Sequence, residues 1–406
     1  MTARPPAACG LAALLGLLAV AAATGRPTVA ADTASAAVQV AQFISVPAFT
    51  APGPAFTARN AKGKSILIVP SASGRVPDFA SMGAFTSGIR QAAKAAGVTT
   101  TTCDNNGTVD QQATCLKGAA TRKPGLVVLV GSLDLVGLQT QLTALKQAGV
   151  PVLATHVLAP GDFPSGVDPS YAKALAGLTA IVPAPFAQAA KLMADYVIAT
   201  SNGAKQTIVL AGANDLPESA PMLAAIQAEF TSSCGSTCAV SSINVPSQTW
   251  QSAAYTAVKN ATLNQTVNYL LPVLDQFDDL AAEGEADARA SLSSVNRPNI
   301  CSYGGAPFAI QMGQAANRVV CDVAEDMNWD GWATMDQALR ILTGTAPVAS
   351  ENLPLRLWTA NNWFTEGVGL AGMTFPPTID AGFGDPDLYI NGYRTLWGLP
   401  ALTAGT

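Results

Sequence analysis

Histidine is almost absent from this chain of 406 residues, because His156 is the only one. Most zinc sites and Ser-His-Asp triads depend on imidazole, often on several, so this count argues against those chemistries. Charge is also scarce: 12% of the residues are Asp, Glu, Lys or Arg, and the formal net charge is −5. Nucleic-acid binding needs a basic surface that displaces counterions from phosphates. We therefore expect no nucleic-acid partner.

The common catalytic motifs are missing as well. The sequence contains no G-x-S-x-G, no P-loop and no G-x-G-x-x-G after a predicted strand. The acidic run DMNWDGW at 326–332 lacks the spaced ligands and the terminal Glu of an EF-hand. Asp278 and Asp279 are adjacent, so on a helix they point in different directions and do not suit paired acid/base work. We predict a protein that is not an enzyme and that holds no metal and no cofactor.

The first 31 residues have the pattern of a secretory signal. Arg4 precedes an apolar stretch of small residues at 7–23, and residues 29–31 (VAA) form an A-x-A-like cleavage site before Asp32. No later segment reaches the roughly 18 unbroken apolar residues of a membrane span. We predict an exported chain in the periplasm, cell envelope or extracellular space, either released or held by an uncleaved signal.

Six cysteines remain beyond this segment, and an oxidising compartment would allow them to form disulfides. Six cysteines allow many pairings, and the sequence alone does not choose among them. Proximity along the chain favours Cys103 with Cys115, Cys234 with Cys238, and Cys301 with Cys321. The Cys-x-x-x-Cys at 234–238 has no second pair at ligand spacing, so we do not expect zinc there.

Apolar runs alternate with amphipathic segments from residue 64 onward. The run SILIV at 65–69 is followed by a loop and then by apolar residues at helical spacing up to Gly97. Further strands are predicted at 98–102, 126–130, 150–154, 207–211, 240–245, 269–274, 300–302 and 319–323. Helices are predicted at 111–120, 135–148, 185–199, 220–230, 253–260, 280–291 and 309–317. Apolar strands that alternate with helices are typical of parallel sheets covered on both faces, so we predict an α/β fold with two doubly wound lobes.

Six phrases of the sequence, in this order, resemble the type I periplasmic sugar-type solute-binding proteins of ABC transporters. They are SILIVPSASGRVPDF (65–79), GAFTSGIRQAAKAAG (83–97), LVVLVGSLDLVGLQTQLTALKQAGVPVLATH (126–156), IVLAGAND (208–215), LLPVLDQFDDLAAEGEADA (270–288) and NICSYGG (299–305). The resemblance covers about residues 64–345 and implies two Rossmann-like lobes with a ligand cleft between them. Together with the signal pattern and the composition, it predicts this organisation: signal 1–31, low-complexity lead-in 32–63, N-terminal lobe 64–168, C-terminal lobe 169–321, return to the N-terminal lobe 322–350, and an extension packing on the lobes at 351–406.

The resemblance places the ligand between the lobes, and open parallel sheets bind ligands outside the carboxyl ends of their strands. The loops at those positions supply the candidate ligand-binding residues: Ser71, Arg75, Asp134, His156, Asn214, Asp275, Gln276 and Asp322 as polar groups, and Phe79, Phe277, Tyr303 and Trp329 as aromatic walls. Alternatives stay open at several of these positions. His156 could be a satisfied polar residue, both phenylalanines could belong to the core, and Asp275 could cap a helix.

Two departures from the sugar binders concern the ligand. Where those proteins place an Asp and then an Arg after the fourth strand, this chain has His156 and Val157. Where they carry Phe-Asp-Gly, it has Tyr303, Gly304 and Gly305. Charged groups that grip hydroxyls are thus missing, so we expect a ligand other than an ordinary hexose.

The resemblance implies a monomeric solute-binding protein that closes over a small molecule and presents the closed form to the membrane permease of an ABC importer. The alternative is a sensing module that hands its closed form to a receptor kinase. The two roles differ in the partner surface, and the sequence does not distinguish them.

Overall fold

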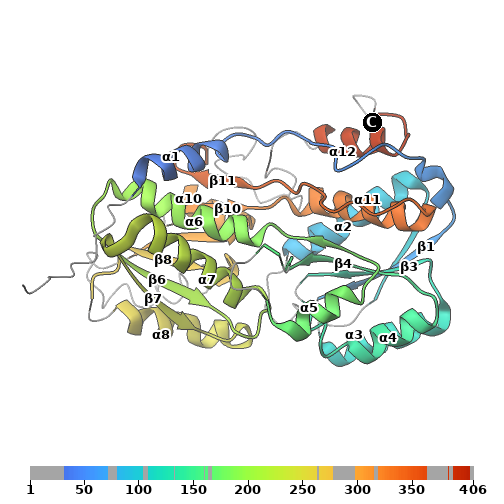
Figure 1. Cartoon of the computed structure of the whole chain (residues 1–406), viewed down its shortest axis with the longest axis horizontal. Helices are drawn as coiled ribbons and strands as arrows, with labels where there is room; N and C mark the ends of the chain where they lie inside the picture. The colour runs from blue at the N-terminus through green and yellow to red at the C-terminus, as the bar shows by residue number, and fades with distance from the viewer. Residues whose placement is uncertain are drawn as a thin grey trace, which may run out of the picture.

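The computed structural model describes residues 32–71, 80–103, 108–131, 133–159, 161–162, 167–262, 265–277, 298–314, 319–363, 383 and 387–402. These residues form two α/β lobes that lie side by side along the long axis of the molecule (Figure 1). The predicted signal at 1–31 and the predicted helix at 280–291 lie outside the described residues. The two-lobed α/β architecture is the one that the alternation of strands and helices predicts.

The N-terminal lobe is built on a five-stranded parallel sheet. Its strands are β1 (Ser65–Pro70), β2 (Thr99–Thr102), β3 (Leu126–Val130), β4 (Val152–Val157) and β5 (Ala180–Pro183), in the order β2-β1-β3-β4-β5. Its helices are α2 (Ala80–Ala96), α3 (Val109–Arg122), α4 (Gln139–Gln147) and α5 (Pro169–Ala176). Every residue of β3 (LVVLV) is buried, as expected of a central strand covered on both faces.

The C-terminal lobe has a six-stranded sheet in the order β11-β10-β9-β8-β6-β7. Its strands are β6 (Gln206–Gly212), β7 (Cys238–Asn244), β8 (Tyr269–Pro272), β9 (Asn299–Gly304), β10 (Val319–Ala324) and β11 (Arg356–Thr359), and only β11 pairs antiparallel. Its helices are α6 (Phe186–Ser201), α7 (Ser219–Glu229), α8 (Trp250–Thr262) and α10 (Pro307–Gln314), with short turns η3 (Phe230–Cys234), η4 (Gly235–Thr237) and η5 (Ser247–Thr249).

The boundaries between the lobes differ from those predicted. The N-terminal lobe continues through α5 and β5, so the chain crosses at 184–185 rather than at 168. β5 is a four-residue edge strand, too short to show periodicity, and the Pro- and Gly-rich stretch before it suggested a false boundary. The chain returns after Ala324, not at residue 322, and α11 (Met327–Thr343) then packs on α2. A third crossing leads to β11, which extends the C-terminal sheet instead of only packing on it.

The predicted low-complexity lead-in is also ordered. Residues Thr33–Gln42 form α1, capped by Asp32, whose side chain accepts a hydrogen bond from the Ser35 amide. α1 packs on α6 of the C-terminal lobe, whereas η1 (Ala58–Ala61) packs on α11 beside the N-terminal lobe. The segment between them runs across the same side of both lobes (Figure 1). Alanine has a high intrinsic helix propensity, but most of the stability of a short helix comes from packing. The sequence pattern does not reveal the surface on which α1 packs.

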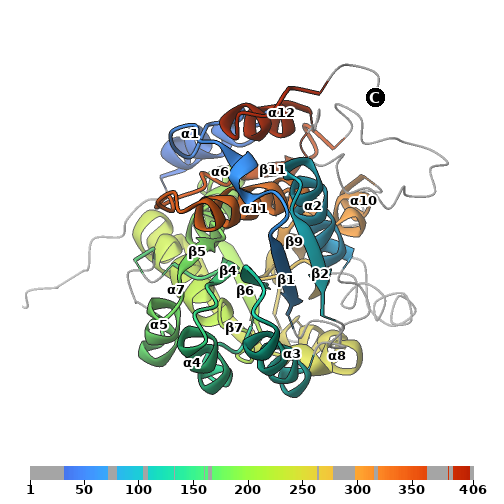
Figure 2. The same cartoon turned by 90° about the vertical axis from the view of Figure 1, so that its right-hand side faces the viewer.

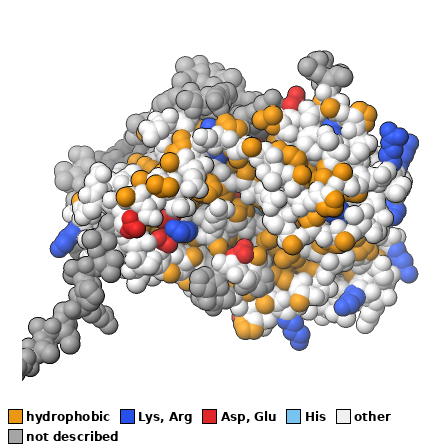
Figure 3. Space-filling model, turned by 45° about the horizontal axis from the view of Figure 1, so that its top comes forward, with side chains coloured by type: hydrophobic (Ala, Val, Ile, Leu, Met, Phe, Trp, Pro, Cys, Tyr) orange, Lys and Arg blue, Asp and Glu red, His pale blue; other side chains and the backbone are white. Residues whose placement is uncertain are grey.

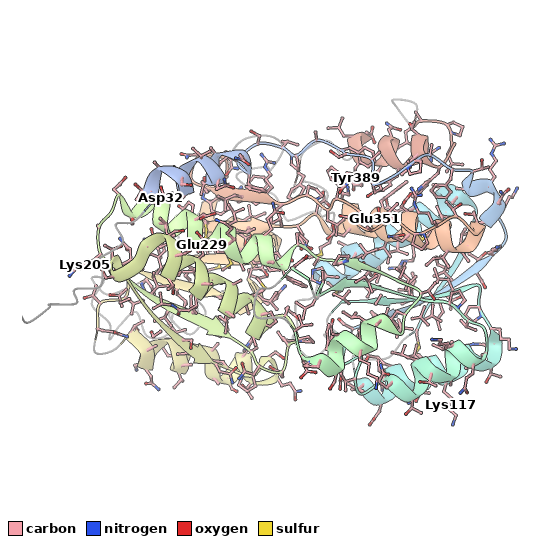
Figure 4. All side chains as sticks on the ribbon, viewed as in Figure 1. Asp32, Lys117, Lys205, Glu229, Glu351 and Tyr389 are labelled. Atoms are coloured by element: carbon pink, nitrogen blue, oxygen red, sulfur yellow. A yellow bond between two sulfur atoms is a disulfide. The ribbon has the colours of Figure 1, made fainter. Side chains whose placement is uncertain are left out.

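The last described helix, α12 (Asp387–Leu396), lies over α11 on the side where the N-terminal segment crosses (Figure 2). An aromatic cluster fills this junction: Phe49, Trp329, Trp332, Tyr389, Tyr393 and Trp397. Trp329 stacks on Tyr389 of α12 with ring centroids 4.7 Å apart, and Figure 4 labels Tyr389 at this junction. The terminal segments thus offer Trp329 an aromatic surface, and its contact with ligand stays a prediction.

Buried charges lie beneath the same cluster. Asp336 accepts hydrogen bonds from Arg340 Nε at 2.6 Å and from Trp397 Nε1 at 2.6 Å. Arg340 also donates to the Pro54 carbonyl and lies over the Phe56 ring, so this network connects α11 with both terminal segments. Glu351 is 2% exposed, and its carboxyl group lies beside that of Asp336. Burial and the nearby charge of Asp336 raise the pKa of Glu351 well above its ordinary value.

Glu351→Gln is expected to change how stability depends on pH. The folded protein keeps a proton on Glu351 that the unfolded chain releases above about pH 4, so wild-type stability falls by up to about 1.4 kcal/mol per pH unit in that range. Glutamine cannot ionise, so the variant should match wild type at pH 4 and exceed it increasingly towards pH 7. Urea unfolding between these pH values measures the difference, with exposed Asp110→Asn as the control. Parallel curves for the variant and wild type would show that Glu351 ionises in the fold.

The structure joins the three cysteine pairs that proximity favoured. Cys103–Cys115 ties the end of β2 to α3, Cys234–Cys238 closes a short loop before β7, and Cys301–Cys321 links β9 to β10. Each disulfide lies within one lobe, so none restricts movement of one lobe against the other.

Basic side chains lie along the outer edge of the N-terminal lobe (Figure 3). Among the exposed ones, Lys94 lies in the last turn of α2 and Lys123 caps α3, where a positive charge complements the helix dipole. Among the helices of the described residues, none combines the length and the hydrophobicity that a membrane crossing requires.

Candidate ligand-binding site between the lobes

The carboxyl ends of β4 in one lobe and of β9 and β10 in the other meet at the junction of the lobes. His156 comes from β4, Tyr303 from β9, and Glu325 follows β10 directly. All three are buried, with exposed fractions of 6%, 0% and 2%. The two sheets thus bring polar side chains together at the place where open parallel sheets bind ligands.

His156 has a backbone conformation that is unusual for a residue with a side chain, because its φ is 55°. The pairing of β4 with β5 shifts register between Thr155 and Val157, and this irregularity redirects the imidazole. The ring lies between Phe85 of α2 and Phe186 of α6, in edge-to-face contact with both. Non-glycine residues held at positive φ are concentrated at functional sites, which fits this position.

Glu325 links His156 to Tyr303. Its Oε2 lies 3.2 Å from His156 Nε2, and its Oε1 accepts a hydrogen bond from the Tyr303 hydroxyl. Burial lowers the pKa of His156, but the adjacent Glu325 more than offsets this, so the pKa lies above its ordinary value. Burial likewise raises the pKa of Glu325, yet His156 and its other neighbours lower it overall. The pair is therefore held as imidazolium and carboxylate.

Two further acids surround this pair. Asp330, on α11, is 1% exposed, and its carboxyl group lies beside that of Glu325. Burial, and then the charge of Glu325, raise the pKa of Asp330 well above its ordinary value. Glu218, just before α7, is also buried, and its charge raises the pKa of His156.

Asp275 and Gln276 follow β8, next to the same strand ends. Asp275 Oδ2 accepts a hydrogen bond from the Ala306 amide at 2.6 Å, while its Oδ1 has no partner. The carboxyl group occupies the space beside Gly304, where a Cβ would lie 2.5 Å from it. Burial and the nearby Asp322 raise the pKa of Asp275 well above its ordinary value. Gln276 is 7% exposed, and its Oε1 also lacks a partner.

Asp322 lies further back, within β10. Its Oδ1 accepts a hydrogen bond from the Ser302 hydroxyl at 3.2 Å on the neighbouring strand, and burial raises its pKa to about 7. Asp322 therefore acts on Asp275 from inside the C-terminal lobe.

The remaining predicted residues lie apart from this cluster or serve local structure. Phe277 packs edge-to-face on Trp250 and is buried in the C-terminal lobe, which fits the alternative that it belongs to the core. Asp134 is exposed, and its side chain accepts a hydrogen bond from the Gly137 backbone amide. Asn214 is also exposed, and its backbone amide donates a hydrogen bond to Asn244 Oδ1. Their contact with ligand stays a prediction, as does that of Ser71, buried after β1. Arg75 and Phe79 lie outside the described residues.

Three residues of the cluster were not predicted from the sequence, for different reasons. Glu325 follows a predicted strand by two residues, and that position was a usable signal. Asp330 and Glu218 belong to helix starts, where acids are common for their effect on the helix dipole alone. Among the described residues, no three His, Cys, Asp or Glu side chains are grouped so that they could hold a metal ion.

No family model matches the sequence, and no curated protein does. Solved structures match well. A sugar ABC transporter protein from Yersinia enterocolitica superposes with a TM-score of 0.62 at 18% identity, covering 86% of this chain and 99% of that one. The fold is that of the type I periplasmic binding proteins.

Two further structures of this fold contain bound molecules. A Mycobacterium smegmatis ABC transporter solute-binding protein with bound glycerol has a TM-score of 0.60 at 16% identity, covering 76% of this chain and 98% of that one. A Caulobacter myo-inositol-binding protein, bound to myo-inositol, has a TM-score of 0.59 at 16% identity, covering 77% and 96%. At these identities the likeness concerns the periplasmic-binding-protein fold and not the ligand.

Proposed function

We propose that this protein binds a small molecule between its two lobes and delivers it, as an exported solute-binding protein, to the membrane permease of an ABC importer. One observation carries the proposal: His156 of the N-terminal lobe meets Glu325 and Tyr303 of the C-terminal side at the strand ends. Polar groups with unused hydrogen-bonding capacity are rare in protein interiors, and here they converge from both lobes.

Hinge closure follows from how the lobes are joined. The chain crosses at 184–185, at 325–326 and at 344–355, and crossing segments can absorb a rotation of one lobe against the other. Opening would expose the buried groups of the cluster to water, and closing would remove them from water again. A ligand that forms hydrogen bonds with those groups binds the closed form more tightly than the open form. This difference in affinity is what shifts the population towards the closed form.

The ligand is proposed to differ from an ordinary hexose. The charged cluster at the junction offers carboxylates and one imidazole, and the Asp-Arg pair of the sugar binders is replaced by His156 and Val157. A hexose presents both donors and acceptors, so its hydroxyl acceptors would remain unpaired among carboxylates.

Removal of the His156 side chain is expected to weaken ligand binding at least tenfold without unfolding the protein. The ring contacts both lobes and pairs with Glu325, so its loss leaves a buried charge unpaired and removes contacts made only on closure. The ligand is found by a thermal-shift screen of sugars, polyols, nucleosides, amines and aromatic acids, because binding to the folded state raises Tm. Calorimetry then compares wild type, His156→Ala and the exposed control Lys205→Ala (Figure 4).

Two results would contradict the proposal. Unchanged ligand affinity in both His156→Ala and Glu325→Gln would show that the ligand does not bind at the junction of the lobes. A ligand-loaded protein that fails to stimulate the ATPase activity of a reconstituted cognate permease would contradict delivery to an importer.

A further inference from the structure

The segment at 32–61 precedes the first strand, and its first part is attached to the C-terminal lobe. Its helix α1 packs on α6 of that lobe. The Phe43 carbonyl accepts a hydrogen bond from the Leu357 amide of β11 at 2.7 Å. The Ile44 carbonyl accepts a second one from Asn362 Nδ2 at 2.9 Å. This part of the segment therefore moves with the C-terminal lobe.

The last part of the same segment is attached to the N-terminal lobe. Arg340 of α11 donates a hydrogen bond from Nη2 to the Pro54 carbonyl at 3.2 Å. The Phe56 amide donates one to the Leu396 carbonyl, at the end of α12, at 2.9 Å. Both η1 and α12 pack on α11, and α11 packs on α2. The segment is thus bonded to one lobe at each end.

Residues 45–53 cross from one lobe to the other, and we call them the strap (Figure 1). The strap contains no helix or strand, and two of its nine residues are proline, which makes it stiffer than an ordinary coil. It packs on the third crossing between the lobes, because a Cβ at Gly53 would lie 2.7 Å from Val348 Cγ1. Gln337 of α11 in turn holds the Val348 backbone through hydrogen bonds of 2.7 and 3.1 Å. The strap therefore covers one of the segments about which the lobes rotate.

Phe49 fixes the middle of the strap to the N-terminal lobe. Its ring lies edge-to-face on Tyr393 of α12, with ring centroids 5.0 Å apart, and 6.2 Å from the Trp329 ring of α11. Gly392 leaves room for this ring, since a Cβ there would lie 2.4 Å from Phe49 Cδ1. The aromatic cluster on α11 and α12 thus holds the strap between its two ends.

Residues 45–48 separate Phe49 from Ile44, the last anchor on the C-terminal lobe. The chain from Ile44 to Phe49 spans at most about 18 Å when fully extended. A rotation that moved these two anchors farther apart would have to pull the Phe49 ring out of the aromatic cluster. We propose that the strap limits the rotation of the lobes and keeps them near the arrangement seen in the structure. This device goes beyond the proposed function, although it assumes the hinge motion of that function.

The test lengthens the strap while leaving its anchors in place. Spin labels are attached through Lys117→Cys in the N-terminal lobe and Lys205→Cys in the C-terminal lobe, both exposed (Figure 4). Double electron–electron resonance measures the distribution of distances between them. A flexible Gly/Ser linker of about twelve residues is inserted between Ser45 and Val46. We expect this insertion to broaden the distribution at least twofold, and the same insertion in the exposed turn at 148–149 of the N-terminal lobe to leave it unchanged.

Substitutions then test the Phe49 anchor. Phe49→Ala removes the ring and should broaden the distribution at least twofold. Gly392→Ala should act in the same direction, because the added methyl group displaces the ring from the other side of the contact. Leu388→Ala is the control on α12, since that side chain is 53% exposed, and it should have no effect. Circular dichroism and urea unfolding establish that each variant is folded.

The outcomes are distinguishable from one another and from a failure of the proposed function. An unchanged distribution in both the strap insertion and Phe49→Ala overturns the strap. Equal broadening by the insertion at 148–149 shows a general loosening and also overturns it. Broadening by Phe49→Ala alone assigns the limit to the aromatic cluster and overturns the role of strap length. These measurements need no ligand, so the thermal-shift screen tests solute binding separately.

Discussion

Asp336→Ala is expected to lower the free energy of unfolding by about 3–5 kcal/mol, the cost of removing one partner of a buried ion pair. Asp336 is fully buried, and its two oxygens hold Arg340 and Trp397. Without it, the Arg340 guanidinium and the Trp397 Nε1–H remain buried without their carboxylate. The contacts of α12 and of the N-terminal segment on α11 should weaken together, because all three depend on this network.

Urea unfolding of Asp336→Ala and of wild type at the same pH measures the effect. Asp110→Ala is the matched control, since Asp110 is an exposed acid in the first turn of α3 and should contribute less than about 1 kcal/mol. A loss below about 1 kcal/mol for Asp336→Ala would mean that the network does not hold the terminal segments.

Gly331→Ala is expected to destabilise the fold by about 2–3 kcal/mol, although alanine is the better helix former by about 1 kcal/mol. Gly331, on α11, faces α2 where the two helices cross. A Cβ there would lie 2.7 Å from the Ile89 amide nitrogen, 2.7 Å from the Phe85 carbonyl oxygen and 2.8 Å from Gly88 Cα. These are backbone atoms of a packed helix, so the helices must separate to admit one methyl group.

Gly83→Ala is the matched control for this prediction. Gly83 lies on the same α2, and a Cβ there meets nothing within 4 Å. The control should be neutral or more stable by up to about 1 kcal/mol, since only helix propensity changes. Thermal or urea unfolding of both variants separates the two effects. Equal stability of Gly331→Ala and Gly83→Ala would mean that the crossing is looser than these distances indicate.

The candidate site shows where strand patterns suffice and where they do not. His156, Tyr303 and Asp275 were predicted because each lies at or just after the end of an apolar strand, and parallel strands end at one edge of a sheet. Phe277 follows the same rule, yet its ring turns into the core against Trp250. A strand pattern places a residue at an edge but does not fix the direction of its side chain.

The sequence by itself determined the α/β alternation and the two lobes, because the spacing of apolar residues is a local property, whereas it only favoured the three cysteine pairs that the structure joins. Only the tertiary structure decided that 33–42 is a helix, that 180–183 and 356–359 are edge strands, and that Trp329 lies beneath α12. It alone brought Glu325 to His156 and Asp330 to Glu325. Short edge strands and alanine-rich helices have local preferences too weak to determine their conformation, so contacts with residues distant in the chain decide it. The same distant contacts decide where an isolated acidic side chain lies.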